Sequence, residues 1–161
     1  MVIDDAANFD EIFFKNNGET DLLTGSIAPN LFNQIVQRDI NLSERSNAPL
    51  SIISLTLNLA KIIAESDHKQ LKNVLENELI RIYFELNKFF RNSDCICRIS
   101  QLGFWILVNG LDPKSTIQIK DRLTNTLPDF VEIAISHHKQ GQNLIDWFSE
   151  VDKVHFKDNN K

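Results

Sequence analysis

With 161 residues, the chain is long enough for one domain with a hydrophobic core and too short for two domains of ordinary size. Its formal net charge of -5 argues against a general binder of nucleic acid or anionic membranes, because both would need a basic face. The first residues are acidic and no long apolar run follows, so we expect neither a signal peptide nor a membrane-spanning helix. These observations predict a cytoplasmic protein with no membrane or nucleic-acid partner.

Hydrophobic periodicity predicts a mixture of helices and strands. The expected helices cover residues 6–15, 29–40, 69–90, 113–123 and 142–156, and the expected strands cover residues 49–57, 95–99, 104–108 and 129–135. Pro29 and Pro113 suit the first turn of a helix, and Asp112 suits the N-cap of the helix that follows it. This order predicts an α+β fold, with a central, mostly antiparallel sheet and helices packed on it.

A β-hairpin over residues 91–108 is the stretch around which the chain is organised. Apolar side chains alternate on both sides of a turn, at Cys95, Cys97 and Ile99 before it and at Phe104, Ile106 and Val108 after it. Alternation with a period of two residues is typical of half-buried strands. We therefore expect two half-buried strands, joined by Ser100-Gln101-Leu102-Gly103 and preceded by a polar loop.

Neither the two cysteines nor the two adjacent histidines at residues 137 and 138 predict a metal site. Cys95 and Cys97 share one face of the expected strand, at a spacing that favours neither a disulfide nor a complete set of metal ligands. We expect both to be buried or half-buried thiols. His137 and His138 are adjacent at the end of a strand, where their side chains point to opposite faces and cannot easily chelate one ion. No cofactor is expected.

Four segments resemble the GGDEF domain of diguanylate cyclases, the enzymes that condense two GTP molecules into cyclic di-GMP. They are Asp21-Leu22-Leu23-Thr24-Gly25, LSIISLTLNLAK at residues 50–61, RISQLGF at residues 98–104, and Val151-Asp152. The resemblance runs from Asp21 to about Phe104 and more loosely to the end of the chain. It implies a nucleotidyl-cyclase-like palm with a ferredoxin-like core over residues 21–161, preceded by an N-terminal helix and linker at residues 1–20.

The same resemblance implies that the catalytic chemistry has been lost. The position of a metal-binding aspartate on the first strand is Thr56, and the acidic pair of the turn is replaced by Leu102 and Gly103. Two-metal phosphoryl transfer needs carboxylates to hold divalent cations against a triphosphate. We therefore expect a degenerate domain with no catalytic residues and no metal. The family's guanine-reading and phosphate-binding positions fall on Ala64, Asn73 and Asn159.

One motif of the family is retained ahead of the hairpin. Arg91-Asn92-Ser93-Asp94 matches the R-x-x-D motif at which many family members bind cyclic di-GMP, and Arg122 falls near a position that supplies a second arginine in some of them. An arginine can bind a phosphate or a guanine edge with two hydrogen bonds, while an aspartate accepts from guanine nitrogens. The structural alternative is a cation at a helix C-terminus, followed by an aspartate that caps the turn.

Two hypotheses for function follow. In the first, the chain is an inactive regulatory module of bacterial signalling that binds cyclic di-GMP through Arg91, Asp94 and Arg122. In the second, it is a protein-interaction or dimerisation domain that binds no nucleotide and pairs with itself or with an active GGDEF-type or EAL-type protein. Residues 21–25 are expected to form a structural turn in either case.

Overall fold

The computed structural model describes residues 12–65 and 70–157. Its helices are α2 (Pro29–Ser46), α3 (Leu59–Glu65), α4 (Leu71–Phe89), α5 (Pro113–Thr126) and α6 (Leu144–Lys157), and its strands are β1 (Leu50–Leu57), β2 (Cys95–Ser100), β3 (Gly103–Asn109) and β4 (Val131–His137). The strands form one sheet in the order β2-β3-β1-β4, and all neighbours in it are antiparallel. The predicted α+β fold is confirmed.

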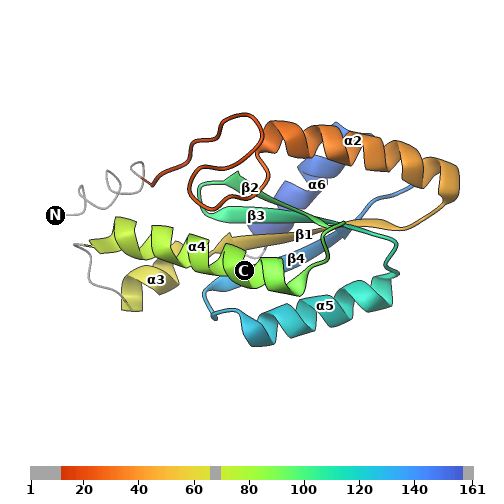
Figure 1. The fold of residues 1–161 in the computed structure, drawn as a ribbon. Coiled ribbons are helices and arrows are strands. Elements are labelled where there is room, and N and C mark those ends of the chain that lie inside the picture. The colour runs from red at the N-terminus through yellow and green to blue at the C-terminus, as the bar shows by residue number, and fades with distance from the viewer. Residues whose placement is uncertain (1–11, 66–69, 158–161) are drawn as a thin grey trace.

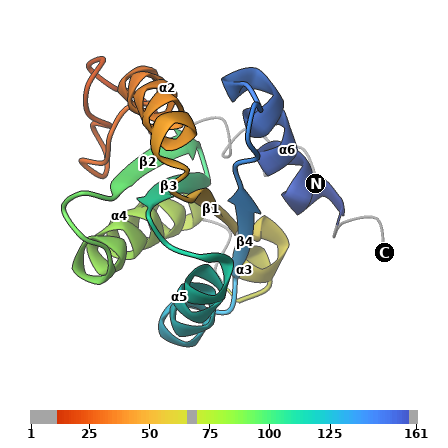
Figure 2. The same ribbon diagram turned by 90° about the vertical axis from the view of Figure 1, so that its right-hand side faces the viewer.

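Helices cover both faces of the sheet (Figures 1 and 2). One core lies between the sheet and α4, α5 and α3, and a second lies between the sheet and α2 and α6. The expectation of two half-buried hairpin strands is therefore wrong for β3, which is buried on both faces along nearly its whole length. Its alternating pattern is interrupted by Trp105 and Leu107, and these two side chains belong to the second core. β2 lies at the edge of the sheet and is more exposed at its ends.

Several element boundaries have local causes. Asp112 accepts a hydrogen bond from the Ser115 amide at 2.7 Å, which confirms the predicted N-cap of α5. α2 begins at Pro29 and continues past Ile40 to Ser46, because no glycine or proline interrupts its polar last turns. β4 begins two residues later than expected, after a turn in which the Val131 amide donates to the Pro128 carbonyl.

One predicted helix differs from the structure, and one helix of the structure was not predicted. Residues 12–15 are not helical, and the rest of the helix predicted at residues 6–15 lies outside the described residues. α3 was not expected as a separate helix. It is capped by Asn58, whose Oδ1 accepts from the Lys61 amide at 3.2 Å, and it buries Ile62 in the first core.

The two thiols are free, as predicted, with Cys97 buried and Cys95 half-buried. Burial raises the pKa of both groups, so neither thiol is activated as a nucleophile. Within residues 12–65 and 70–157, no helix is both long enough and apolar enough to cross a membrane.

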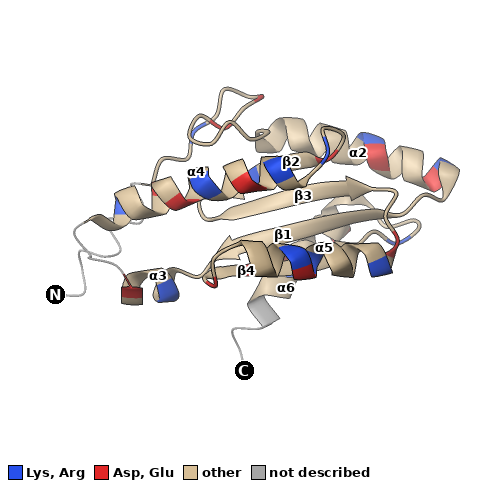
Figure 3. Ribbon diagram, turned by 60° about the horizontal axis from the view of Figure 1, so that its bottom comes forward, with Lys and Arg blue, Asp and Glu red and all other residues tan. Residues whose placement is uncertain are grey.

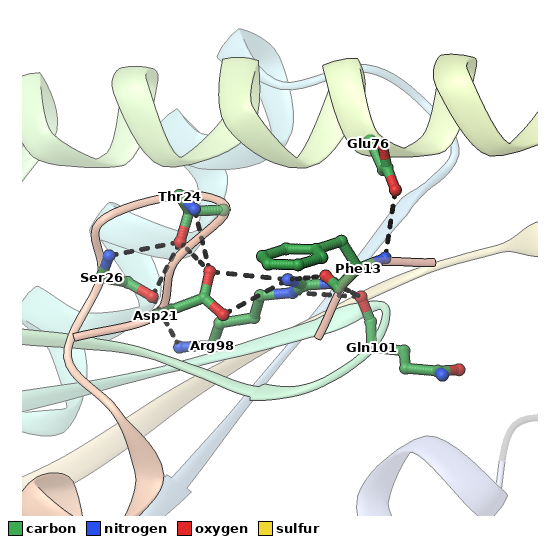
Figure 4. Close-up of polar contacts among 7 residues, drawn as sticks. All are labelled: Phe13, Asp21, Thr24, Ser26, Glu76, Arg98 and Gln101. Carbon is green, nitrogen blue, oxygen red and sulfur yellow. Dashed lines mark hydrogen bonds and ion pairs between the residues drawn. The ribbon is translucent and has the colours of Figure 1, made fainter. Parts of the chain in front are cut away.

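A buried ion pair connects the start of the described chain to the hairpin (Figure 4). Arg98 is fully buried, and its Nη1 lies 3.3 Å from Asp21 Oδ1. The same guanidinium donates to the carbonyl of Phe13 at 2.6 Å and to the carbonyl of Gln101 at 2.9 Å. Burial lowers the pKa of Arg98, and the charge of Asp21 opposes that shift. One side chain thus joins the N-terminal segment, the loop at residues 21–25 and the hairpin turn.

Asp21 is held in place by its own loop. Its Oδ2 accepts from the amide of Thr24 at 2.9 Å and from the hydroxyl of Thr24 at 2.7 Å. Ser26 completes the network, because its Oγ accepts from the Arg98 amide at 3.1 Å. The loop therefore provides the counter-charge and the polar groups that hold Arg98 at the hairpin, which fits a structural turn at residues 21–25.

Asp21→Asn should destabilise the domain strongly. The substitution leaves the Arg98 cation buried without a counter-charge, and breaking a buried pair in this way costs on the order of 3–5 kcal/mol. Urea unfolding of the parent and variant measures the loss. Lys139→Ala is the control, because it removes an exposed pair with Glu150 that contributes at most about 1 kcal/mol. Similar losses for the two variants would contradict the role given to Asp21.

Candidate functional site

A pocket of about 560 Å³ lies beside the hairpin turn. Its walls come from all four strands and from α2 and α6, and include the side chains of Trp105 and Phe148. Space for a side chain at Gly103 is restricted, because a Cβ there would lie 2.7 Å from Ser100 Oγ and 3.3 Å from the Leu55 carbonyl oxygen. The tight hairpin therefore shapes one side of the pocket.

The charged groups at this pocket are Glu132, Asp152 and His155. Glu132 Oε1 accepts from the side-chain Nδ2 of Asn58 at 2.9 Å, and His155 Nε2 lies 2.7 Å from the Ser54 hydroxyl. Burial raises the pKa of Asp152, and the charge of His155 opposes that shift. Among the described residues that line the pocket, none is Lys or Arg. Two carboxylates with no Lys or Arg beside them disfavour a polyphosphate unless cations intervene.

The carboxylates do not form a cation site. In the described part of the chain, no group of three or more His, Cys, Asp or Glu side chains is placed to hold a metal ion. The adjacent His137 and His138 are used separately, since His137 Nδ1 contacts Ser51 Oγ and His138 Nε2 contacts the Gln142 carbonyl oxygen. The sequence did not indicate Glu132 or His155, because only the tertiary fold brings β4 and α6 to the turn.

The polar loop between α4 and β2 holds the second candidate site. Asp94 Oδ2 accepts from the Arg91 amide at 3.1 Å and lies 3.4 Å from Arg91 Nε. Arg91 Nη2 also donates to the carbonyl of Asn109 at 3.3 Å. One carboxylate oxygen thus caps the turn, as the structural alternative predicted, and the arginine connects the loop to the end of β3.

The second carboxylate oxygen of Asp94, Oδ1, takes no part in capping the turn. The Asp94 side chain is only 4% exposed, and its Oδ1 is buried with no hydrogen-bond partner among the described residues. Asp94 and Arg91 line a small pocket of about 130 Å³ together with Tyr83 and Asn87 of α4. The Arg91 side chain is 61% exposed. A buried acceptor and an exposed cation therefore lie side by side at this pocket.

Arg122 lies near the same end of α4. Its guanidinium carbon is 4.7 Å from the centre of the Phe89 ring, and Phe89 is the last residue of α4, two positions before Arg91. A guanidinium over an aromatic ring is a favourable cation–π contact. The structure thus brings Arg122 from α5 toward the loop of Arg91 and Asp94, with Phe89 as the residue that it contacts there.

Comparison with known proteins identifies the fold. No protein-family model matches the chain, and no curated protein matches it. Solved structures do match. The GGDEF domain of DgcB from Caulobacter crescentus, in complex with c-di-GMP, superimposes with a TM-score of 0.75 at 10% identity, over 91% of this chain and 92% of that one. The chain has the GGDEF-domain fold.

Other structures with this fold match as well. Diguanylate cyclase SiaD from Pseudomonas aeruginosa, in complex with its activator SiaC, gives a TM-score of 0.75 at 12% identity over 88% of this chain and 58% of that one. A microbial GGDEF domain studied with cyclic di-GMP gives a TM-score of 0.71 at 16% identity over 86% of this chain and 88% of that one. At these identities the likeness shows the fold alone.

In this GGDEF-like domain, Thr56 on β1 pairs directly with Gly103 on β3. The sequence comparison placed a metal-binding aspartate at the first position and an acidic residue of the turn at the second. The fold brings the two positions side by side, and neither residue present has a carboxylate.

Asp152→Asn should stabilise the GGDEF-like domain slightly at neutral pH and have less effect in acid. Burial raises the folded-state pKa of this carboxyl. Its contribution to stability is therefore fully present below the unfolded pKa of about 3.9 and is lost as the pH rises through the folded pKa. Thermal unfolding of parent and variant as a function of pH measures the effect, which is small because Asp152 is exposed at the pocket rim.

Glu150→Gln is a control for which the expected effect on stability at neutral pH has the opposite sign. The hydrogen bond from Lys139 is the main cause that lowers the pKa of Glu150, so its contribution to stability is present at neutral pH and is lost as the pH falls through the folded pKa. If the difference in unfolding temperature between the Asp152→Asn variant and the parent did not change with pH, the raised pKa assigned to Asp152 would be wrong.

Proposed function

We propose that this chain is a catalytically inactive regulatory domain that binds cyclic di-GMP through Arg91 and Asp94, with Arg122 as a further contact. The observation that carries the proposal is the buried Asp94 Oδ1, which has no hydrogen-bond partner among the described residues and lies beside an exposed arginine. Leaving a buried acceptor without a donor costs about 1–3 kcal/mol. A ligand that supplies a donor at this point would recover that free energy.

The chemistry of the ligand fits the three residues. Guanine carries N–H donors on its Watson–Crick edge, which the Asp94 carboxylate accepts, and each phosphate is an anion that an exposed guanidinium binds with charge-assisted hydrogen bonds. The Phe89 ring and the Arg122 guanidinium form a stacked pair next to the loop, and guanidinium planes are good platforms for nucleobases. Three of the solved structures with this fold were determined with this ligand, which supports the choice of nucleotide.

In this proposal the turn at residues 100–103 has a structural role and no catalytic one. Thr56 and Gly103 stand where the comparison expects carboxylates, and the pocket beside them contains acidic groups that are not arranged as a metal site in the described residues. Without divalent cations held at these positions, the charge of a bound triphosphate is not neutralised. The domain therefore senses a nucleotide and does not produce one.

Isothermal titration of the purified domain with cyclic di-GMP should show saturable binding. Arg91→Ala should weaken binding by roughly 10-fold to 100-fold or abolish it, because hydrogen bonds to charged groups contribute about 1.5–3 kcal/mol. Asp94→Asn should also weaken binding. Arg81→Ala is the matched control, since Arg81 is an exposed arginine of α4 that lies outside the small pocket, and it should bind as the parent does. No heat at high-micromolar ligand would overturn the proposal.

Incubation of the domain with GTP and either magnesium or manganese should yield no cyclic di-GMP. The expected absence of product follows from Thr56 on β1 and Gly103 at the turn, which stand where the family has carboxylates. An active diguanylate cyclase assayed in parallel verifies the conditions. Formation of cyclic di-GMP above the background of heat-denatured protein would show that the domain is an enzyme and would contradict the inactive assignment.

The second candidate is a protein-interaction domain that binds no nucleotide. The matching SiaD structure is a complex with an activator protein, and α4 of this chain exposes the large apolar side chains Ile80 and Phe84. Partners would be a second copy of the chain or an active GGDEF-type or EAL-type protein. Light scattering and pull-down with such proteins distinguish this candidate, because binding would persist in the Arg91→Ala variant.

A further inference from the structure

The solvent side of α4 carries a ridge of four residues, Glu76, Ile80, Phe84 and Lys88, each four positions from the next. Residues at this spacing lie along one line on a helix surface. Ile80 is 43% exposed and Phe84 is 59% exposed, although both are large apolar side chains. The opposite face of α4, which includes Leu75, Leu79, Ile82 and Leu86, already fills the first core. The apolar side chains of the ridge, Ile80 and Phe84, therefore do not belong to the core of this domain.

The ridge begins with an acidic side chain, Glu76, and ends with a basic one, Lys88. Contacts within the domain hold both side chains in place. Glu76 Oε1 accepts from the Phe13 amide at 3.1 Å, as Figure 4 shows. Lys88 Nζ lies 4.2 Å from the centre of the Phe84 ring and 3.5 Å from Glu85. Figure 3 shows acidic and basic residues alternating along this helix. The ridge thus has an acid, two apolar residues and a base in fixed order.

Two copies of the ridge that run in opposite directions have complementary charges at each end. If two copies of α4 pack antiparallel about a two-fold axis between Ile80 and Phe84, Ile80 of one copy meets Phe84 of the other. Glu76 of each copy then meets Lys88 of the other, so the two ion pairs form at opposite ends of one apolar contact. Symmetric dimers use the same patch on both subunits in this way. Ridges of residues four apart are also those that interdigitate in the commonest packing of two helices.

We infer that α4 is a homodimerisation surface of this chain, with the second copy bound antiparallel through the Glu76–Lys88 ridge. The inference does not depend on nucleotide binding. Phe13, which is 36% exposed, lies next to Glu76 and extends the apolar part of the surface. One helix crossing buries less than the roughly 1,200 Å² of a standard interface, so the dimer is weak and exchanges quickly. Salt weakens it further, because its ion pairs are near the surface.

Sedimentation velocity of the parent over a range of micromolar concentrations, without nucleotide, should show association. Phe84→Glu should be monomeric at every concentration, and its exposure means that the variant still folds, which circular dichroism verifies. Arg91→Ala should associate as the parent does, so that a failure of self-association can be told apart from a failure of nucleotide binding. Lys114→Glu on α5 makes the same charge change as a ridge variant at an exposed site away from α4, and it should leave association unchanged.

A charge swap tests the register of the helices. Glu76→Lys and Lys88→Glu should each be monomeric, because each places like charges opposite one another at both ends. An equimolar mixture of the two variants should associate, since a mixed pair restores opposite charges at both ends. A parent that stays monomeric, a mixture that does not associate, or a Phe84→Glu variant that associates as the parent does would overturn the inference.

Discussion

The ion pair between Asp21 and Arg98 is the interaction on which the rest of the domain depends. A fully buried guanidinium needs a counter-charge and acceptors for its remaining donors, and here Asp21, Phe13 and Gln101 provide them, so that the N-terminal segment is joined to the hairpin. The pair fixes the hairpin turn against the loop at residues 21–25. That loop continues into Ile27, whose amide donates to Ile96 on the outer edge of β2 and so covers an otherwise open strand.

Fixing the hairpin has different consequences at its two ends. At the turn, Gly103 pairs with Thr56 and shapes a pocket whose charged side chains are mainly acidic, so the site that a nucleotide triphosphate would need is not favoured there. At the other end, the entry to β2 places Asp94 beside Arg91 and leaves a buried carboxylate oxygen without a partner in the described chain. The proposed nucleotide site is therefore the loop between α4 and β2.

Local patterns predicted much of the fold. The alternation around residues 100–103 located the hairpin, and Asp112-Pro113 located the start of α5 because capping is a property of neighbouring residues. Burial of β3 on both faces could not be predicted from its alternation, since it depends on helices from distant parts of the chain. The partnership of Asp21 with Arg98, 77 positions apart, was equally hidden. The R-x-x-D motif was visible in the sequence, but the unsatisfied oxygen of Asp94 became apparent only once the loop was folded.

Chemical-shift mapping decides most directly where a nucleotide binds. Addition of cyclic di-GMP to labelled protein should shift the backbone amides of residues 91–95 and the signals of Arg122, while the amides of Thr56 and residues 100–103 stay unchanged. Such a result would place the ligand at the loop between α4 and β2. Shifts concentrated at Thr56 and the turn, or no shifts at all, would contradict the assignment of Arg91 and Asp94 as the nucleotide site.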